Sequence, residues 1–527
     1  MTDTQLQEST GIRLLKKGQK GLMYAVFSRM GIVIFLFLIQ LLFLFGIFQK
    51  FEQYIPHFLG GSAVFIIAMV LYLINNGMDP SAKITWLIII MAFPVFGALL
   101  LLYTQTDTGH RAIKKRLKSL MEQTMESIPQ NPETMEALSK ENPETAALSR
   151  YLSRTGCFPV YDHTDVAYFP LGEDKFYEML RQLEQASHFI FLEYFIVDEG
   201  LMWGKVLELL AEKAKAGVEV RMMYDGTCEF STLPYDYPKR LERLGIKCKM
   251  FSPLTPFVST HYNYRDHRKI LVIDGHTAFT GGVNLADEYI NRRVRFGHWK
   301  DTAIMLKGEA VKSFTLMFLQ MWNMDEKVPL FKRYLQYPVP EKPDTPGYVI
   351  PYGDCPLDRD RVGEQVYIDI LNHAVRYVHI MSPYLIIDNV MENALKFAAE
   401  RGVEVVLILP GIPDKPMPYA LAKTHYSSLL ESGVKIFEYT PGFVHAKVFV
   451  SDDEKAVVGT INLDYRSLDH HFECAAYLYR TSCIPDIEKD FQETLAKCRQ
   501  VTPETIRKEK LTVRLTGQVL KFLAPLL

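Results

Sequence analysis

Apolar residues are distributed very differently in the two parts of the chain. Near the N-terminus three long apolar segments follow one another, at 30–48, 58–74 and 84–103. Each approaches the ~20 residues that a helix needs to cross a bilayer. We therefore expect a membrane region at 1–108 with transmembrane helices, and buried core helices are the alternative. After this region the apolar residues occur in short runs that alternate with helical patterns.

The second part contains one succession of elements twice. Leu183 to Asp198 and Leu371 to Asp388 both read as a helix end, an apolar strand and an aspartate. In both copies a later helix stops at a glycine and a further strand follows. This alternation predicts an α/β fold with mainly parallel, buried β-sheets. We expect two repeated domains, 151–335 and 336–510, packed about a pseudo-twofold axis.

The segments beside the repeats differ from them in composition. Residues 109–150 combine a basic stretch with one rich in Glu, Pro, Asn and Thr, which predicts a basic helix followed by a linker with short helical turns. The tail at 511–527 is apolar, with Arg514 and Lys521 as its charged residues. Such a tail is typical of an interfacial helix on a membrane, or of a segment packed on the preceding domain.

Basic residues flank the membrane region on both sides, which leaves its topology open. Five precede the first apolar segment and five follow the third: Arg13, Lys16, Lys17, Lys20 and Arg29, then Arg111, Lys114, Lys115, Arg116 and Lys118. Both ends are therefore expected in the cytoplasm, but three full spans would place them on opposite sides. Either 58–74 does not cross, or 84–103 is re-entrant at Pro94 and Gly97, or the charge rule is violated here.

Overall charge and cysteine usage exclude some classes. A net charge of -2 lends no support to a nucleic-acid binder. The seven cysteines are scattered without a C-x-x-C pair, so neither a disulfide framework nor a zinc site is indicated. Free cysteines throughout the repeated domains favour a reducing, cytoplasmic location for them. The oligomeric state stays open.

The candidate chemistry lies in a motif that occurs once in each repeat. Its pattern is His-x-Lys-x-x-x-x-Asp, followed at equal offsets by a Gly-Gly or Gly-Thr pair and an Asn. The catalytic candidates are His267, Lys269, Asp274, His445, Lys447 and Asp452, and the substrate-binding candidates are Gly282, Asn284, Thr460 and Asn462. If His and Lys lie on a strand, their side chains share one face because the period is two. The two copies predict one active site built from two halves.

Such a site suits a phosphodiester. One neutral imidazole can attack phosphorus to form a phosphohistidine, and the other can protonate the leaving oxygen and then activate the incoming hydroxyl. The lysine and asparagine side chains would stabilise the developing negative charge. The scheme needs no metal ion and no other cofactor.

Carboxylates are expected to orient the imidazoles. Asp301 and Glu473 each precede an apolar strand after their motif, and we predict that they orient the histidines. Asp274 and Asp452 belong to the motif, but we expect them to anchor a local turn. The adjacent His470 and His471 are interpreted as polar turn residues rather than as a metal site, because no second cluster of ligands accompanies them.

These residues resemble the signature of the phospholipase D superfamily, which both motif copies match in full. More narrowly, the chain resembles the bacterial cardiolipin synthases of that superfamily: it has N-terminal membrane segments, paired catalytic halves, the Pro94-x-x-Gly97 pattern and an Ala524-Pro525-Leu526-Leu527 ending. The resemblance covers nearly the whole chain. The segment 30–48 is an addition to the two-segment pattern of many members, which is why the topology is in doubt.

The resemblance implies transfer of a phosphatidyl group from one phosphatidylglycerol to another, giving cardiolipin and glycerol through a phosphohistidine. It implies His267 as nucleophile and His445 as acid, although the residues alone leave the two equivalent. Independently of the resemblance, the apolar segments predict a multi-pass protein of the cell membrane, and the free cysteines and flanking basic residues favour the cytoplasmic side for its catalytic domains.

Other functions stay open at this stage. A membrane phospholipase D would use water as the acceptor, and a related phosphatidyltransferase would use another headgroup alcohol; the motifs do not reveal the acceptor. A superfamily nuclease is disfavoured by the membrane region. A membrane scaffold without catalysis has no physical need to keep six motif residues.

Overall fold

The computed structural model describes most of the chain. The described residues are 11–15, short pieces between 38 and 50, 62–92, 97–98, 100–102, 108–125, 127–251, 264–339, 343–358 and 360–524. They belong to two compact units, one of residues 1–15, 116–253 and 264–518, and one of 16–115, 254–263 and 519–527. Most of the predicted apolar segment 30–48, Pro94 and the last three residues of the chain lie outside the described residues.

The smaller unit contains α4 (Ser62–Asn75) and α5 (Pro80–Ala92), which lie in the predicted apolar segments 58–74 and 84–103. Asp79 caps the start of α5, where its Oδ1 accepts a hydrogen bond from the Ser81 N–H at 2.8 Å. The two helices share a small core with Leu73, Trp86 and Ile90. No helix among the described residues is both long enough and apolar enough to span a membrane.

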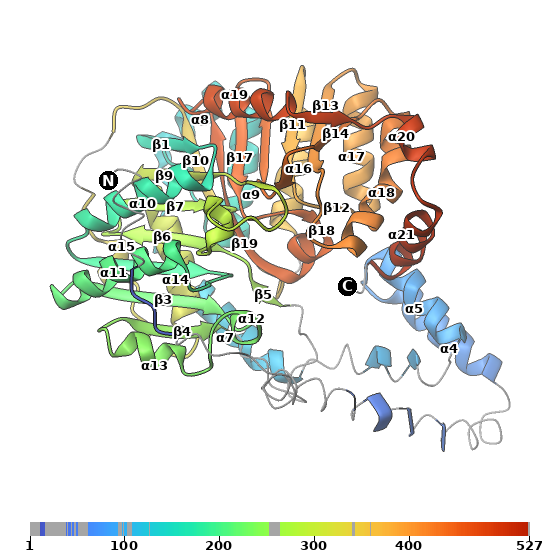
Figure 1. Ribbon diagram of the computed structural model, residues 1–527, viewed down its shortest axis with the longest axis horizontal. Helices are drawn as coiled ribbons and strands as arrows, with labels where there is room; N and C mark the ends of the chain where they lie inside the picture. Colours follow the sequence, from blue (N-terminus) through green and yellow to red (C-terminus); the bar gives the residue numbers. More distant parts are fainter. Residues whose placement is uncertain are drawn as a thin grey trace. The chain divides into compact units, whose positions relative to one another are not determined.

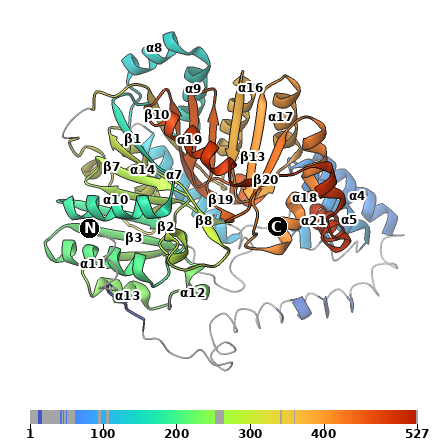
Figure 2. The ribbon, with the colours of Figure 1, turned by 45° about the horizontal axis from the view of Figure 1, so that its top comes forward.

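The larger unit consists of two α/β halves (Figures 1 and 2). In the first half the strands run in the order β1-β9-β7-β6-β2-β3-β4. Their bounds are β1 (Thr164–Phe169), β2 (Phe189–Tyr194), β3 (Glu219–Asp225), β4 (Lys247–Phe251), β6 (Lys269–Ile273), β7 (Thr277–Gly281) and β9 (Ala303–Gly308). The helices around them are α10 (Gly172–Gln185), α11 (Leu201–Lys215), α12 (Cys228–Ser231), α13 (Tyr237–Glu242), η1 (Asp287–Ile290), α14 (Val311–Trp322) and α15 (Lys332–Leu335).

Both faces of this first sheet are covered. On β2, Ile190 and Leu192 belong to the core that α10 and α11 complete. Phe191 alternates with them and stacks on Phe318 of α14, with ring centroids 4.7 Å apart. Successive strand residues point to opposite faces, so the continuous apolar run of β2 reflects burial on both sides.

The second half repeats the arrangement. Its strands run in the order β10-β19-β17-β16-β11-β13-β14-β20, and the short β5 (Arg265–Asp266) of the first half pairs with β19. The strand bounds are β10 (Tyr348–Asp354), β11 (Tyr377–Met381), β13 (Glu404–Pro410), β14 (Lys435–Tyr439), β16 (Val448–Ser451), β17 (Lys455–Gly459), β19 (His471–Tyr479) and β20 (Cys498–Gln500). The helices are α16 (Val362–His373), α17 (Asn389–Glu400), α18 (Pro416–Glu431), η2 (Arg466–His470), α19 (Ile484–Leu495), α20 (Pro503–Arg507) and α21 (Leu511–Leu523).

The sheets are mixed, so the prediction of mainly parallel sheets is wrong. Within the two large sheets, the described strands run parallel only in β2-β3-β4 and β11-β13-β14, where helices connect them. Each motif strand instead returns as an antiparallel hairpin, β6 to β7 and β16 to β17. The chain reverses through residues in the left-handed conformation, Asp274 and Gly275 in one hairpin and Asp452 and Asp453 in the other. An Asp-Gly pair between apolar runs is a hairpin signal that the sequence interpretation did not use.

Two further expectations need correction. The motif histidines do not lie on strands: β6 begins at Lys269 and β16 at Val448, after the histidine in each case. The basic stretch forms the helix α7 (Thr108–Thr124), and the stretch expected to be a linker with short helical turns forms the longer helices α8 (Pro132–Glu141) and α9 (Pro143–Gly156). The repeated Asn-Pro pairs mark their starts, because Asn131 and Asn142 are N-caps that accept from backbone N–H groups, and proline occupies the first turn.

Short strands connect the two halves. Besides β5 with β19, β8 (His298–Lys300) pairs in parallel with β15 (Gly442–Val444), and within the second half β12 (Leu385–Ile386) pairs with β18 (Leu463–Asp464). Each cross-half pair joins the residues just before a motif histidine to the strand region of the other half. The connections therefore bring both motifs to one place.

Candidate active site

His267 is held by a carboxylate of the opposite half. The His267 N–H donates to the Phe472 carbonyl at 2.9 Å, which places the histidine beside β19. Its Nδ1 lies 2.9 and 3.0 Å from the two Oε atoms of Glu473. Because Nδ1 is engaged, Nε2 is the nitrogen available for chemistry.

His445 has the reciprocal arrangement. Its N–H donates to the Lys300 carbonyl at 2.7 Å, and its Nδ1 lies 2.6 Å from Asp301 Oδ2. The carboxylates proposed from the sequence are thus exchanged, each contacting the histidine of the other repeat. This reciprocal exchange is the relation expected for halves around a pseudo-twofold axis.

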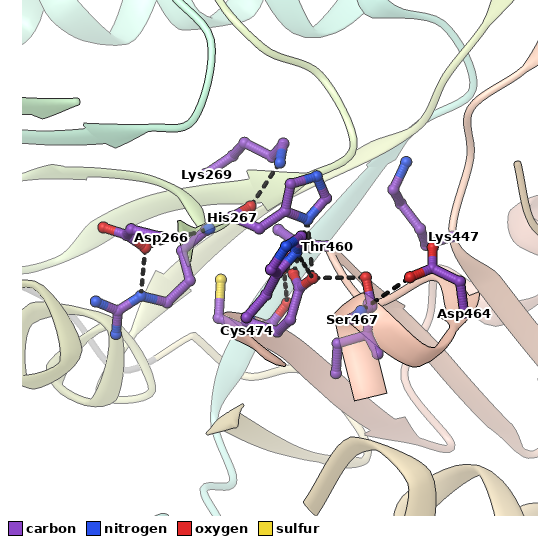
Figure 3. Close-up of polar contacts among 12 residues, drawn as sticks. Asp266, His267, Lys269, Lys447, Thr460, Asp464, Ser467 and Cys474 are labelled. Atoms are coloured by element: carbon purple, nitrogen blue, oxygen red, sulfur yellow. Dashed lines mark hydrogen bonds and ion pairs between the residues drawn. The ribbon is translucent and has the colours of Figure 1, made fainter. Parts of the chain in front are cut away.

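Gly282 and Thr460, which we predicted to bind substrate, contact the two orienting carboxylates. The Thr460 hydroxyl donates to Glu473, and Ser467 Oγ donates to the same carboxylate at 2.7 Å (Figure 3). A Cβ added to Gly282 would lie 2.0 Å from Asp301 Oδ1. The Thr460 hydroxyl therefore orients Glu473, whereas Gly282, which has no side chain, leaves room for Asp301.

The two motif lysines are buried and adjoin the histidines. Lys269 Nζ donates to the His267 carbonyl at 2.5 Å, and Lys447 Nζ donates to the His445 carbonyl. Burial lowers the pKa of Lys269 to about 8 and that of Lys447 to about 7. The charge of Lys269 also lowers the pKa of Lys447, so the two halves share one electrostatic site.

Both histidines favour the neutral form. Burial lowers the pKa of His267 well below its usual range, against the opposing effect of Glu473. Burial, assisted by Lys447, lowers the pKa of His445 to about 4, although Asp301 opposes the shift. A neutral imidazole suits a nucleophile. A bound phosphodiester would add negative charge and favour the protonated form that a general acid requires.

The two motif asparagines are used differently. Asn284 Oδ1 accepts from the Ile196 N–H at 3.0 Å and its Nδ2 donates to the Tyr289 hydroxyl at 2.8 Å. In contrast, Asn462 Oδ1 is buried without a hydrogen-bond partner among the described residues. Its amide therefore retains capacity for a ligand, whereas that of Asn284 is engaged within the protein.

The motif aspartates lie apart from the imidazoles. Asp274 accepts the N–H groups of residues 187–189, each at 2.8 Å, and Asp452 accepts those of residues 375–377 at 2.7–2.9 Å. Each carboxylate thus ties its hairpin turn to the start of β2 or β11. This geometry matches an anchoring role and gives neither aspartate a contact with the histidine pair.

Several buried groups that support the site have no sequence signal of their own. Arg268 forms ion pairs with Glu193 at 2.5 Å and with Asp266 at 3.1 Å, which hold the segment that carries His267. Lys175 Nζ donates to the Val283 carbonyl at 3.4 Å, and the Tyr367 hydroxyl donates to the corresponding Ile461 carbonyl at 2.9 Å. In the sequence, the only sign that Lys175 and Tyr367 have corresponding roles is that Val283 and Ile461 occupy equivalent positions of the two repeats.

An aromatic ring also accompanies each motif histidine. The His471 ring lies 5.4 Å from that of His267, and the Trp299 ring lies 5.4 Å from that of His445. Each of these residues is two positions before an orienting carboxylate. Among the described residues, His267, His471 and Glu473 also form a group whose ligand atoms lie within 4.8 Å of one another.

Comparison with known proteins agrees with this geometry. The family described as "Cardiolipin synthase, PLD-like domain" matches residues 179–322 and 367–495. A cardiolipin synthase from Geobacillus kaustophilus is 35% identical over 468 residues, which cover 88% of this chain and 92% of that protein. This chain belongs to the cardiolipin synthase family of phospholipase D-like proteins. Membership makes it an enzyme of the phosphatidyltransferase type.

Other relatives extend the comparison. An uncharacterized protein from Streptococcus mutans is 58% identical over 462 residues, covering 88% of this chain and all of that protein. The crystal structure of phosphatidylserine synthase from Haemophilus influenzae matches with a TM-score of 0.53 at 14% identity, over 69% of this chain and 93% of that one. The latter likeness concerns the fold.

Proposed function

We propose that this protein synthesises cardiolipin by transferring a phosphatidyl group from one phosphatidylglycerol to a second. The observation that carries the proposal is the exchanged pair of histidine–carboxylate contacts, in a chain of the cardiolipin synthase family. Two imidazoles with separate carboxylates suit a displacement in two steps.

In the first step, His267 Nε2 attacks phosphorus and the bond to the glycerol headgroup breaks. His445 donates its proton to the departing glycerol oxygen, and Lys269 and Lys447 stabilise the charge on the non-bridging oxygens. In the second step, His445 removes the proton of a headgroup hydroxyl of a second phosphatidylglycerol. That oxygen attacks phosphorus, the phosphorus–nitrogen bond breaks, and cardiolipin and free His267 result.

The assignment of His267 as nucleophile rests on family resemblance, because each histidine has a carboxylate and a lysine. Asp301 and Glu473 keep the Nδ1 proton in place and stabilise each imidazolium when it forms. Asn462 Oδ1 is the available acceptor for a substrate hydroxyl. The scheme uses no metal ion or other cofactor.

Location in the cell membrane, with several spans and with the catalytic halves on the cytoplasmic side, is part of the proposal. Apolar residues of α4 and α5 are exposed, including Ile67, Leu71 and Ile88. Leu511, Leu515 and Val519 recur at a spacing of four on α21 and are also exposed. Lys508, Lys510 and Arg514 line a cavity of about 500 Å³ beside this helix, which suits an anionic lipid surface.

A lipid assay tests the function. Full-length protein in detergent is incubated with phosphatidylglycerol alone, and the products are separated. We expect cardiolipin and glycerol in equal amounts; phosphatidic acid alone would instead indicate a hydrolase with water as acceptor. Samples of wild type, His267→Ala and His445→Ala are quenched with denaturant at neutral pH, because a phosphorus–nitrogen bond is labile in acid, and are then searched for a phosphatidyl adduct. An adduct on His445 would overturn the assignment of His267.

A further inference from the structure

His471 introduces a chemical difference between two otherwise similar halves. It begins β19, and its side chain is about nine-tenths buried. Its Nδ1 lies 3.7 Å from Glu473 Oε1, beyond hydrogen-bond distance, and has no hydrogen-bond partner among the described residues. A buried imidazole nitrogen without a partner is costly unless it has a ligand.

The surroundings of this nitrogen are those of a metal ligand set. One ligand atom from each of His267, His471 and Glu473 lies within 4.8 Å of the other two. Two imidazoles and a carboxylate are a donor set that zinc accepts, at bond lengths of about 2.0–2.2 Å. Side-chain shifts of about 1 Å would bring the three atoms to such distances. Thr460 and Ser467 already hydrogen bond to Glu473 and would orient the carboxylate.

The other half lacks this set. Around His445, Trp299 occupies the position that His471 occupies around His267. In the strand pairing, His471 lies opposite Arg265, two residues before His267. Trp299 likewise lies opposite Phe443, two residues before His445. An indole offers only an N–H donor and no lone pair to a metal ion. The pair of His445 and Asp301 therefore has no third ligand from this position.

We propose that His267, His471 and Glu473 bind a divalent transition-metal ion of the zinc class, and that the bound ion inhibits the enzyme reversibly. The ion takes the Nδ1 lone pair of neutral His267, so the single ring proton moves from Nδ1 to Nε2. A protonated Nε2 has no lone pair with which to attack phosphorus, so the bound ion blocks the first step. The ligand set stands on geometry alone, whereas the inhibition rests on the proposed function.

Direct metal binding tests the site. Full-length protein is treated with chelator, freed of it, and titrated with Zn²⁺ by calorimetry and with Co²⁺ by visible absorption. We expect one ion per chain in the wild type and a dissociation constant raised by roughly 10- to 100-fold in His471→Asn. The matched control is His276→Asn, a histidine of the β6–β7 turn that contacts Thr277 Oγ1 and should bind as the wild type does. Equal Zn²⁺ affinity in His471→Asn and wild type would overturn the site.

Inhibition is measured on the same proteins. Zn²⁺ should inhibit phosphatidyl transfer by the wild type, chelator should restore it, and the inhibitory concentration should rise in His471→Asn by the factor seen in binding. His471-dependent binding without inhibition would refute the inhibitory role alone. If chelated wild type forms no cardiolipin while Co²⁺ still gives a His471-dependent spectrum, the proposed function fails and the metal site stands.

Discussion

At the scale of single residues, each imidazole that we propose to be catalytic contacts one carboxylate from the opposite half. Asp301→Asn and Glu473→Gln keep the shape but remove the charge that stabilises an imidazolium. We expect either change to lower kcat by roughly 10²- to 10⁴-fold. The measurement is cardiolipin formation in mixed micelles, with thermal unfolding to verify the fold.

A matched control lies in the same half. Glu488 also hydrogen bonds to a buried histidine, His379, with Nδ1–Oε distances of 2.9 and 3.0 Å, but it lies outside the site. Glu488→Gln should therefore keep kcat near that of the wild type. A Glu473→Gln enzyme with more than about a tenth of wild-type activity would contradict the role assigned to Glu473.

The motif lysines predict how activity depends on pH. Burial lowers the pKa of Lys447 to about 7 and of Lys269 to about 8, so these groups lose their protons as the pH rises through those values. Since the ammonium form binds the phosphodiester, kcat/KM should decline with increasing pH above about 7. A bound phosphodiester raises both pKa values, and kcat should decline only at higher pH. Parallel alkaline declines of kcat and kcat/KM would argue against this assignment.

At the scale of elements, the motif aspartates connect each hairpin to a neighbouring strand. Asp274 is buried and accepts three N–H groups, one of them on buried Phe189, whereas two of the three N–H groups on Asp452 are exposed. Asp274→Asn should lower the free energy of unfolding by about 1–3 kcal/mol, and Asp452→Asn by less, because water can replace exposed bonds. Denaturant unfolding measures both changes.

The same pair of variants separates an anchoring role from a catalytic one. The folded fraction of each variant should retain kcat within about threefold of the wild type. A fall of 10²-fold in kcat with unchanged stability would show that the aspartates take part in the chemistry after all.

At the scale of the whole molecule, the larger unit should behave as one assembly of two halves. Cross-half contacts include β5 with β19, β8 with β15 and the ion pair of Lys300 with Asp490 at 2.7 Å. A protease site inserted after exposed Asp344, and cut after folding, should leave the two pieces associated and active. Gel filtration and the lipid assay check this. Separation of the pieces with loss of activity would mean that the covalent connection holds the halves together.

The prediction from sequence was most successful where the signal is local and repeated. The apolar runs at β2 and β11 and the helices that end before Gly217 and Gly402 were recognised, because burial and glycine punctuation appear directly in the chain. Parallel pairing of the motif strands was wrong, since strand direction depends on the hairpin that follows. The helices α8 and α9 are longer than the short helical turns expected there, because the Asn-Pro pairs that start them were interpreted as linker residues.

The sequence by itself was enough to propose the chemistry of this protein: two histidines, two lysines and two later carboxylates, each in a duplicated unit, predict a two-step displacement at phosphorus. Only the tertiary structure decided which groups meet. Pairing between the halves brings His267 to Glu473 and His445 to Asp301. Asn284 Oδ1 is hydrogen bonded, whereas Asn462 Oδ1 has no partner among the described residues. His471 and Trp299 lie in equivalent places beside the two histidines. The physical reason is that these contacts join residues far apart in the chain. Which residues meet depends on how the two sheets pack, and no local sequence pattern encodes that packing.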